Sequence, residues 1–283
     1  MAKEKKTDIS RRQFFKSSAV AAVGLTAVGA GVSLIQKYKQ DDKNRKALLR
    51  PPGAIDEDRF LYACIKCGLC VQICPIQAIE LAGINEALSY GTPYINARDQ
   101  ACDFSCDSLQ CAETCPTAAL NFIQFKKAGL TAIEAVQKQG PEALKNINPF
   151  KVQIVAMKKT VHIGVAKLNE KTCLAVQGKG FNGIPRGENF DGVLRPVTKE
   201  SRKAYPLKEQ KYEREICDLC VTECPIGETA ITMEKTTNTD STISFKPKVL
   251  KGCTGCGVCE MICPNNPPSI VIEPSKTFEE VYS

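Results

Sequence analysis

The hydrophobic and polar positions of the chain change character twice along its 283 residues. Residues 17–36 contain no charged side chain, whereas residues 37–50 are rich in charge and predict a tether. From residue 51 onward, short apolar runs alternate with loops dense in cysteine. Residues 128–139 show the spacing of a longer surface helix, which Gly140 and Pro141 would end. The pattern predicts an α+β fold built from short elements.

Two later stretches carry weaker patterns. Residues 151–168 predict two strands interrupted by Lys158 and Lys159, with the single histidine, His162, in the second strand. We expect His162 to be a packed or surface residue rather than a metal ligand. Residues 174–216 hold five glycines and three prolines and predict a long insertion. This insertion would cover a cysteine site from water, dock a partner protein, or form a solvent-exposed loop without a dedicated role.

The first 36 residues predict a targeting segment. The stretch SRRQFFK, from Ser10 to Lys16, places two arginines before two phenylalanines, ahead of the uncharged run. It resembles a twin-arginine export signal, with Phe15 where leucine is usual. The alternative is a retained membrane anchor, because the uncharged run would just span a hydrocarbon core of about 30 Å. We expect a periplasmic protein at the membrane surface.

Sixteen cysteines form a repeat of four groups, each ending in Cys-Pro. Groups one and four have the spacing C-x2-C-x2-C-x3-C-P and comprise Cys64, Cys67, Cys70 and Cys74, and Cys253, Cys256, Cys259 and Cys263. Group two has the spacing x3, x4, x3 and comprises Cys102, Cys106, Cys111 and Cys115. Group three contains Cys217, Cys220 and Cys224, and we assign Cys173, across the insertion, as its first member. The alternative is a buried free Cys173, which would leave one site a ligand short.

The spacing predicts four [4Fe-4S] clusters. Three thiolates at i, i+3 and i+6 can wrap around one cube, and in two-cluster bacterial ferredoxins the fourth cysteine of each run ligates the other cluster. Applied here, that rule defines four ligand sets. Set one is Cys64, Cys67, Cys70 and Cys115; set two is Cys102, Cys106, Cys111 and Cys74; set three is Cys173, Cys217, Cys220 and Cys263; set four is Cys253, Cys256, Cys259 and Cys224.

Zinc sites and disulfide frameworks fit the cysteine pattern less well. A structural zinc site uses paired CxxC knuckles across a longer loop, and disulfide frameworks serve small domains that lack a core. Neither accounts for four Cys-Pro endings, each followed by apolar residues that predict a turn and a returning strand. We therefore expect two ferredoxin-like lobes, residues 51–125 and 151–275, joined by a linker helix within residues 126–150. Residues 276–283 would form a tail.

Composition limits the function. One histidine and no tryptophan leave little material for histidine-based catalysis, and no nucleotide loop or nucleophile triad is visible. The leader holds six basic and two acidic side chains within residues 1–16, so it contributes most of the net charge of +7. The chain also lacks a basic stripe with interleaved aromatic residues, and nucleic acid is therefore not an expected partner. We expect an electron-transfer component rather than a catalytic subunit.

The leader, the sixteen cysteines and the stretch CLA at Cys173–Ala175 before a long gap together resemble ferredoxin-type proteins of the NapG/MauM group. The resemblance implies a carrier that receives electrons from quinol through a membrane iron-sulfur partner of the NapH type. It would pass them to a periplasmic nitrate reductase or its cytochrome. An iron-sulfur subunit of another exported molybdopterin oxidoreductase, a methylamine-utilisation ferredoxin and a non-redox assembly protein stay open as alternatives.

Overall fold

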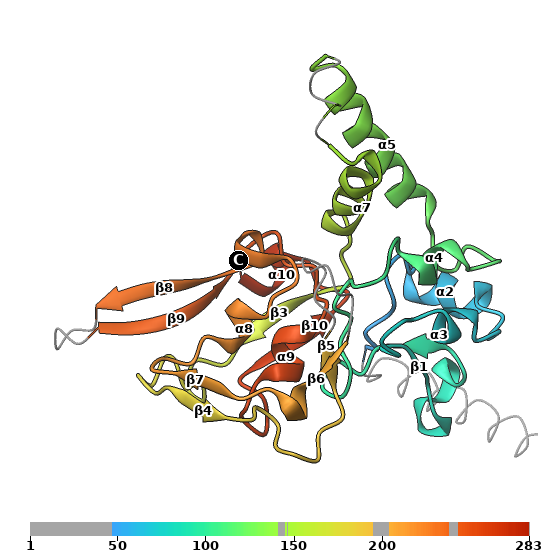
Figure 1. The fold of residues 1–283 in the computed structure, drawn as a ribbon. Helices are drawn as coiled ribbons and strands as arrows, with labels where there is room; N and C mark the ends of the chain where they lie inside the picture. The colour runs from blue at the N-terminus through green and yellow to red at the C-terminus, as the bar shows by residue number, and fades with distance from the viewer. Residues whose placement is uncertain (1–46, 141–144, 146, 195–203, 238–242, 283) are drawn as a thin grey trace, which may run out of the picture. The chain divides into compact units, whose positions relative to one another are not determined.

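The structure is a computed structural model that describes residues 47–140, 145, 147–194, 204–237 and 243–282 (Figure 1). Within it, Leu48–Ser283 forms one compact unit. The predicted leader and the predicted tether up to residue 46 lie outside the described residues. The end of the predicted tether belongs to the folded unit, because Leu49 and Arg50 are both buried. No helix of the described ranges is long and apolar enough to cross a membrane.

Antiparallel pairings frame groups one and two. Strand β1 (Glu80–Leu81), which follows group one, pairs with β2 (Pro93–Tyr94), which precedes group two. An isolated bridge joins Ala54, before group one, to Leu120, after group two. The segment that enters the first group thus pairs with the segment that leaves the second.

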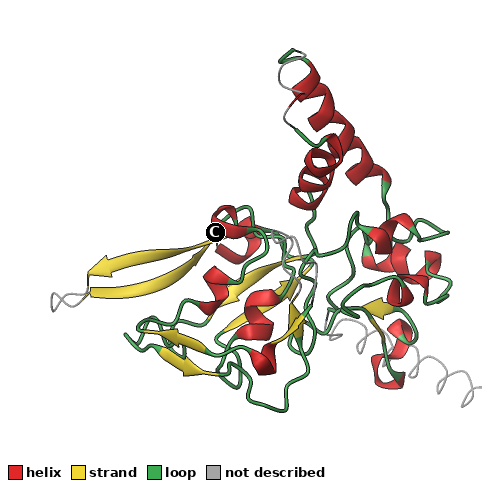
Figure 2. Ribbon diagram, viewed as in Figure 1, coloured by secondary structure: helices red, strands yellow, loops and turns green. Residues whose placement is uncertain are grey.

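The same order recurs around groups three and four. Strand β3 (Gly164–Leu168), before Cys173, pairs with β10 (Ile270–Pro274), which follows group four. Strand β8 (Ile231–Thr237), after group three, pairs with β9 (Ile243–Val249), which precedes group four. The expected mixture of helix and strand is confirmed, and the elements are short (Figure 2).

Each cysteine group contributes one short helix that carries its third cysteine. These helices are α3 (Leu69–Gln72), α4 (Gln110–Glu113), α8 (Leu219–Thr222) and α9 (Val258–Ile262). Other short helices in the described part of the chain are α2 (Glu57–Ala63), η1 (Ile84–Ser89), η2 (Leu207–Glu209), η3 (Gly227–Thr229) and α10 (Phe278–Tyr282). Helix α10 lies in the predicted tail, and it is anchored because the Tyr282 hydroxyl donates to the Ala166 carbonyl at 2.7 Å.

The two longest helices of the described ranges correct the sequence prediction for the stretch between the predicted lobes. Helix α5 (Ile123–Gln137) begins earlier than predicted, and α7 (Pro149–Lys159) occupies the whole first predicted strand of residues 151–168. That strand prediction was wrong because Asn148 caps a helix, its side chain accepting from the Lys151 N–H, and proline at the first helical position favours helix entry. Packing then holds α7 against α5 (Figure 1). The Met157 side chain lies next to Gly129.

The second predicted strand exists, but it begins after His162. This histidine is exposed, and its Nε2 atom is hydrogen-bonded to the Lys276 carbonyl at 2.8 Å. It is a surface residue, as expected, although it does not lie in the strand.

The described part of the insertion is packed and is not a solvated excursion. Strand β4 (Phe181–Gly183) pairs with β7 (Tyr212–Arg214), and β5 (Val193–Leu194) pairs with β6 (Tyr205–Pro206). Leu194 and Leu207 are buried in a core cluster shared with residues of both predicted lobes. The apolar side chains of the insertion therefore find a core only in the folded unit.

Candidate iron-sulfur sites

Left-handed backbone turns shape the entry of three cysteine loops. The residue two positions after the first cysteine has a positive φ in groups one, two and four, namely +57° at Lys66, +55° at Phe104 and +74° at Gly255. Such a φ is uncommon for residues other than glycine. Its recurrence shows that different side chains adopt one backbone bend, which curves the loop around the space inside it.

A second left-handed turn follows the Cys-Pro endings. The residue three positions after the last cysteine has φ of +54° at Gln77, +55° at Ala118 and +76° at Gly227. Backbone amides beyond these turns point back to sulfur: the Ala78 N–H donates to Cys74 Sγ at 3.3 Å, and the Leu120 N–H to Cys115 Sγ at 3.4 Å. Amide donors to cysteine sulfur tune iron-sulfur sites.

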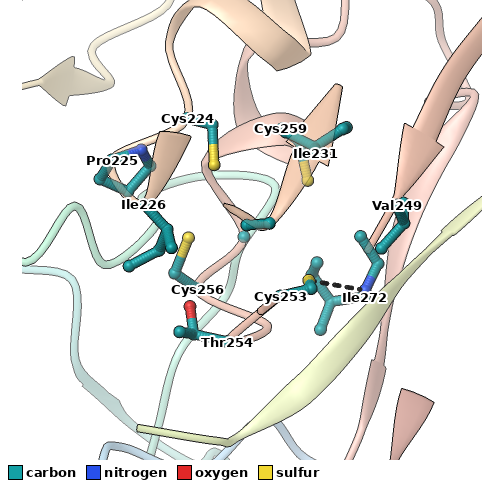
Figure 3. Close-up of a pocket in the computed structure, with 13 residues that line it drawn as sticks. Cys224, Pro225, Ile226, Ile231, Val249, Cys253, Thr254, Cys256, Cys259 and Ile272 are labelled. Carbon is teal, nitrogen blue, oxygen red and sulfur yellow. Dashed lines mark hydrogen bonds between the residues drawn. The ribbon is translucent and has the colours of Figure 1, made fainter. Parts of the chain in front are cut away.

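The thiols of set four surround one cavity. Cys224, Cys253, Cys256 and Cys259 line a space of about 340 Å³, and Figure 3 shows the sulfur atoms of Cys224, Cys256 and Cys259 directed toward it. The Sγ atom of Cys253 accepts a hydrogen bond of 3.5 Å from the Ala166 N–H (Figure 3). Group three thus supplies one cysteine to the pocket of group four.

Sets one and three surround cavities of nearly the same size. The four cysteines of set one line a space of about 360 Å³ between α3 and the Cys115–Pro116 turn. Those of set three line a space of about 340 Å³ next to β10, where the Ser269 N–H donates to Cys263 Sγ at 3.3 Å. Cys173 lines its cavity together with Cys217 and Cys220 despite the long gap in sequence.

Mutual electrostatic repulsion indicates that the cysteines of set two lie near one another. Burial raises the pKa of Cys111, and the charges of Cys106 and Cys74 raise it further. Burial also raises the pKa of Cys102, and the charges of Cys106 and Cys111 raise it further. Cys70, of set one, acts on Cys111 as well, so sets one and two adjoin.

The thiols have the electrostatics of a cation-binding site. Burial, followed by the charges of Cys64, Cys67 and Cys115, raises the pKa of Cys70 to about 11. Thiolates so close together disfavour one another, and a positively charged iron core would offset this repulsion. None of the sixteen cysteines forms a disulfide bond. Among the described residues, no group of three or more His, Cys, Asp or Glu side chains could hold a single metal ion. Four thiols placed around one cavity suit a polynuclear cluster.

The loops of sets two and four meet directly. The Cys102 N–H donates to the Cys256 carbonyl at 3.1 Å, and the Ala101 N–H donates to Met261 Sδ at 3.2 Å. Gly257 lies so close to Ala97 that an added Cβ would be 2.5 Å from the alanine Cβ. The two predicted lobes thus touch at the cysteine loops themselves.

Two cations beside these loops were not predicted. The Arg98 guanidinium donates to the carbonyls of Glu260, Cys263 and Asn265 at 2.6, 2.8 and 2.6 Å. Lys158, at the end of α7, is buried against the loop of group two. The Asn-Pro helix start could have indicated α7, but no local signal identifies the carbonyls that either cation contacts.

Comparison with known proteins identifies iron-sulfur families. The family described as 4Fe-4S dicluster domain matches residues 63–119, and that described as 4Fe-4S binding domain matches residues 250–266. The chain is 32% identical over 278 residues to the ferredoxin-type protein NapG of Escherichia coli (strain K12), with 97% of this chain and 90% of that protein covered. It is 30% identical over 264 residues to the methylamine utilization ferredoxin-type protein MauM of Methylorubrum extorquens, with coverage of 93% and 87%. No solved structure matches.

Proposed function

Because the chain belongs to the family of ferredoxin-type proteins NapG and MauM, we propose that it carries electrons from quinol to a periplasmic nitrate reductase or its cytochrome. A membrane iron-sulfur partner of the NapH type would deliver the electrons. The observation that carries the redox role is the cysteine architecture: in three of the four ligand sets, all four thiols line one cavity.

The proposal includes four [4Fe-4S] clusters in two ferredoxin-like lobes, one cluster for each ligand set. Each bound cluster would supply a centre that accepts and releases one electron. The protein's contribution is to hold the thiols, to donate amide hydrogen bonds to sulfur, and to keep the sets close together. The contacts support an adjacency of one, two, four and three. Sets one and two interact electrostatically, and sets two and four meet at Cys102 and Cys256. Cys220 of set three acts electrostatically on Cys259 of set four.

Iron content tests the cluster count. The full chain, purified without oxygen, should contain about sixteen iron atoms, four for each cube. Cys173→Ser and Cys217→Ser should each lower this to about twelve, and the double variant should lose no more, because both cysteines belong to set three. A Cys173→Ser variant that keeps all sixteen iron atoms would refute the split third group.

Deletion of the gene tests the pathway. Quinol-dependent nitrate reduction in whole cells should fall, and a plasmid copy of the gene should restore it. An unchanged rate would remove nitrate reductase as the acceptor. The 30% identity to MauM supports a second candidate, methylamine oxidation, so growth on methylamine should be measured in the same strains.

The proposed location is the periplasmic side of the membrane. It rests on the twin arginine of the leader, and export of a protein already folded around its cofactors would protect the thiols from disulfide formation. Cell fractionation should find the protein in the periplasm or at its membrane surface. Replacing Arg11 and Arg12 by lysine should retain it in the cytoplasm, and a normally exported variant would contradict this route.

A further inference from the structure

Lys158 is a buried cation directed at one cysteine loop. Its side chain is only 8% exposed, although the next residue, Lys159, is exposed. The Lys158 ammonium donates hydrogen bonds to the carbonyl of Phe104 and, at 2.7 Å, to that of Cys106. Burying an ammonium group has a large desolvation cost, and an apolar side chain would avoid it. Packing alone therefore does not account for a charge at this position.

The two carbonyls that accept from Lys158 belong to a backbone bend in group two. Phe104 has a left-handed backbone, with φ of +55°, and the carbonyls on either side of Ser105 both accept from Lys158. The bend lies between Cys102 and Cys106, where three residues separate the cysteines instead of the two found in groups one and four. Lys158 thus clamps the longer turn that places two thiols of set two.

The ammonium of Lys158 also lies beside the segment that carries two thiols of set two. It is 2.7 Å from the carbonyl oxygen of Cys106, whose side chain is one of these thiols. Removal of the ammonium would leave the surroundings of set two less positive. A redox centre in a more negative environment gains an electron less readily.

We propose that Lys158 is a positioning residue for set two, which fixes the loop from Cys102 to Cys106 and whose charge makes the cluster held there easier to reduce. This inference rests on the proposed function, because it assumes a cluster bound by set two. The reduced form carries one more negative charge than the oxidised form, so a fixed cation nearby stabilises it preferentially. Lys158 would act through the loop and through space without itself ligating iron.

The test is a redox titration of the intact protein monitored by electron paramagnetic resonance. Lys158→Gln keeps an N–H donor but removes the charge, Lys158→Arg keeps the charge, and Lys159→Gln removes the exposed neighbouring charge as a matched control. The signal of set two is identified as the one lost in Cys106→Ser. At a fixed potential, Lys158→Gln should lower the ratio of reduced to oxidised cluster at set two by about tenfold. This corresponds to a reduction potential lower by about 59 mV for a one-electron couple. Lys158→Arg and Lys159→Gln should leave it near the wild-type value.

An unchanged potential of set two in Lys158→Gln, with iron content intact, would overturn the inference. So would an equal shift in Lys159→Gln, because an exposed charge would then act as strongly as the buried one. If Lys158→Gln loses about four iron atoms, Lys158→Arg decides: retained iron and potential support the inference, and lost iron contradicts it. Wild-type protein without iron would instead refute the proposed function, so the two failures are distinguishable.

Discussion

Gly257 provides a sensitive test of the contact between the loops of sets two and four. It follows Cys256 directly, has φ of +93°, and a Cβ built on it would lie 2.5 Å from the Cβ of Ala97. Gly68 occupies the equivalent place in group one, with φ of +74°, but a Cβ there would meet no atom within 4 Å. The two glycines therefore share a backbone requirement and differ in the space available.

The comparison of Gly257→Ala with Gly68→Ala isolates the steric part of the destabilisation at Gly257. A left-handed backbone costs about 1–2 kcal/mol for alanine at either position. Overpacking adds roughly 1–3 kcal/mol at Gly257 alone. For a folded unit of this size, ~1 kcal/mol corresponds to about 2–4 °C in Tm, so Gly257→Ala should melt roughly 2–12 °C below Gly68→Ala.

The assay is anaerobic thermal denaturation of both variants, followed by the visible absorption of the clusters at one scan rate, because loss of the clusters is irreversible. Ala97→Gly, added to Gly257→Ala, should recover most of the steric loss because it removes the opposing Cβ. Ala97→Gly in the wild-type background is the control for its own effect. Equal melting of the two glycine variants, or no recovery, would refute the close approach of the two loops.

Three further substitutions test contacts that the sequence did not predict. Arg50→Met removes a buried guanidinium paired with Glu57 at 2.6 Å and should cost about 2–4 kcal/mol, seen as a Tm lower by roughly 4–16 °C in the same anaerobic scans. Arg98→Met leaves three carbonyls around the end of α9 without their donor, so hydrogen exchange of residues 258–269 should increase; unchanged exchange would argue against this role. Tyr212→Phe removes the hydroxyl that donates to Glu223 at 3.1 Å and should cost about 1 kcal/mol, or about 2–4 °C in Tm in the same scans, with an unchanged Tm contradicting the bond.

Much of the candidate site could be predicted because iron-sulfur ligation is expressed in short spacings. The x2-x2-x3 runs of groups one and four define loops whose local backbone geometry places three thiols around one space. The assignment of each group's fourth cysteine to the neighbouring cluster follows the rule of two-cluster ferredoxins. The structure places Cys115 with the first three cysteines of group one, and Cys224 with those of group four. Cys173 was assigned by counting, and the structure places it beside Cys217 and Cys220.

The fold between the two predicted lobes was harder to predict, because apolar alternation is ambiguous over a short segment. Val152, Ile154 and Ala156 alternate as in a strand, yet the Asn148 cap and the packing of Met157 on Gly129 make the segment a helix. The insertion was equally ambiguous, because its few apolar residues have no partners within their own stretch. Their partners belong to a core that forms only in the folded chain.

Residues a few positions apart are sufficient to indicate the cofactor class, three complete cysteine groups and the turns that end all four groups, because these features depend on local spacing. Cys173 joins group three across the insertion, and the family rests on the pattern of most of the chain. Packing of the whole folded unit determines which loops meet, which cation is buried against which carbonyl, and which glycine cannot accept a side chain. Cys102 and Cys256, Arg98 and Asn265, and Lys158 and Phe104 are far apart in sequence and come together only through packing. Local spacing is set by covalent geometry, whereas such distant contacts depend on the balance of burial and hydrogen bonding over the whole folded unit.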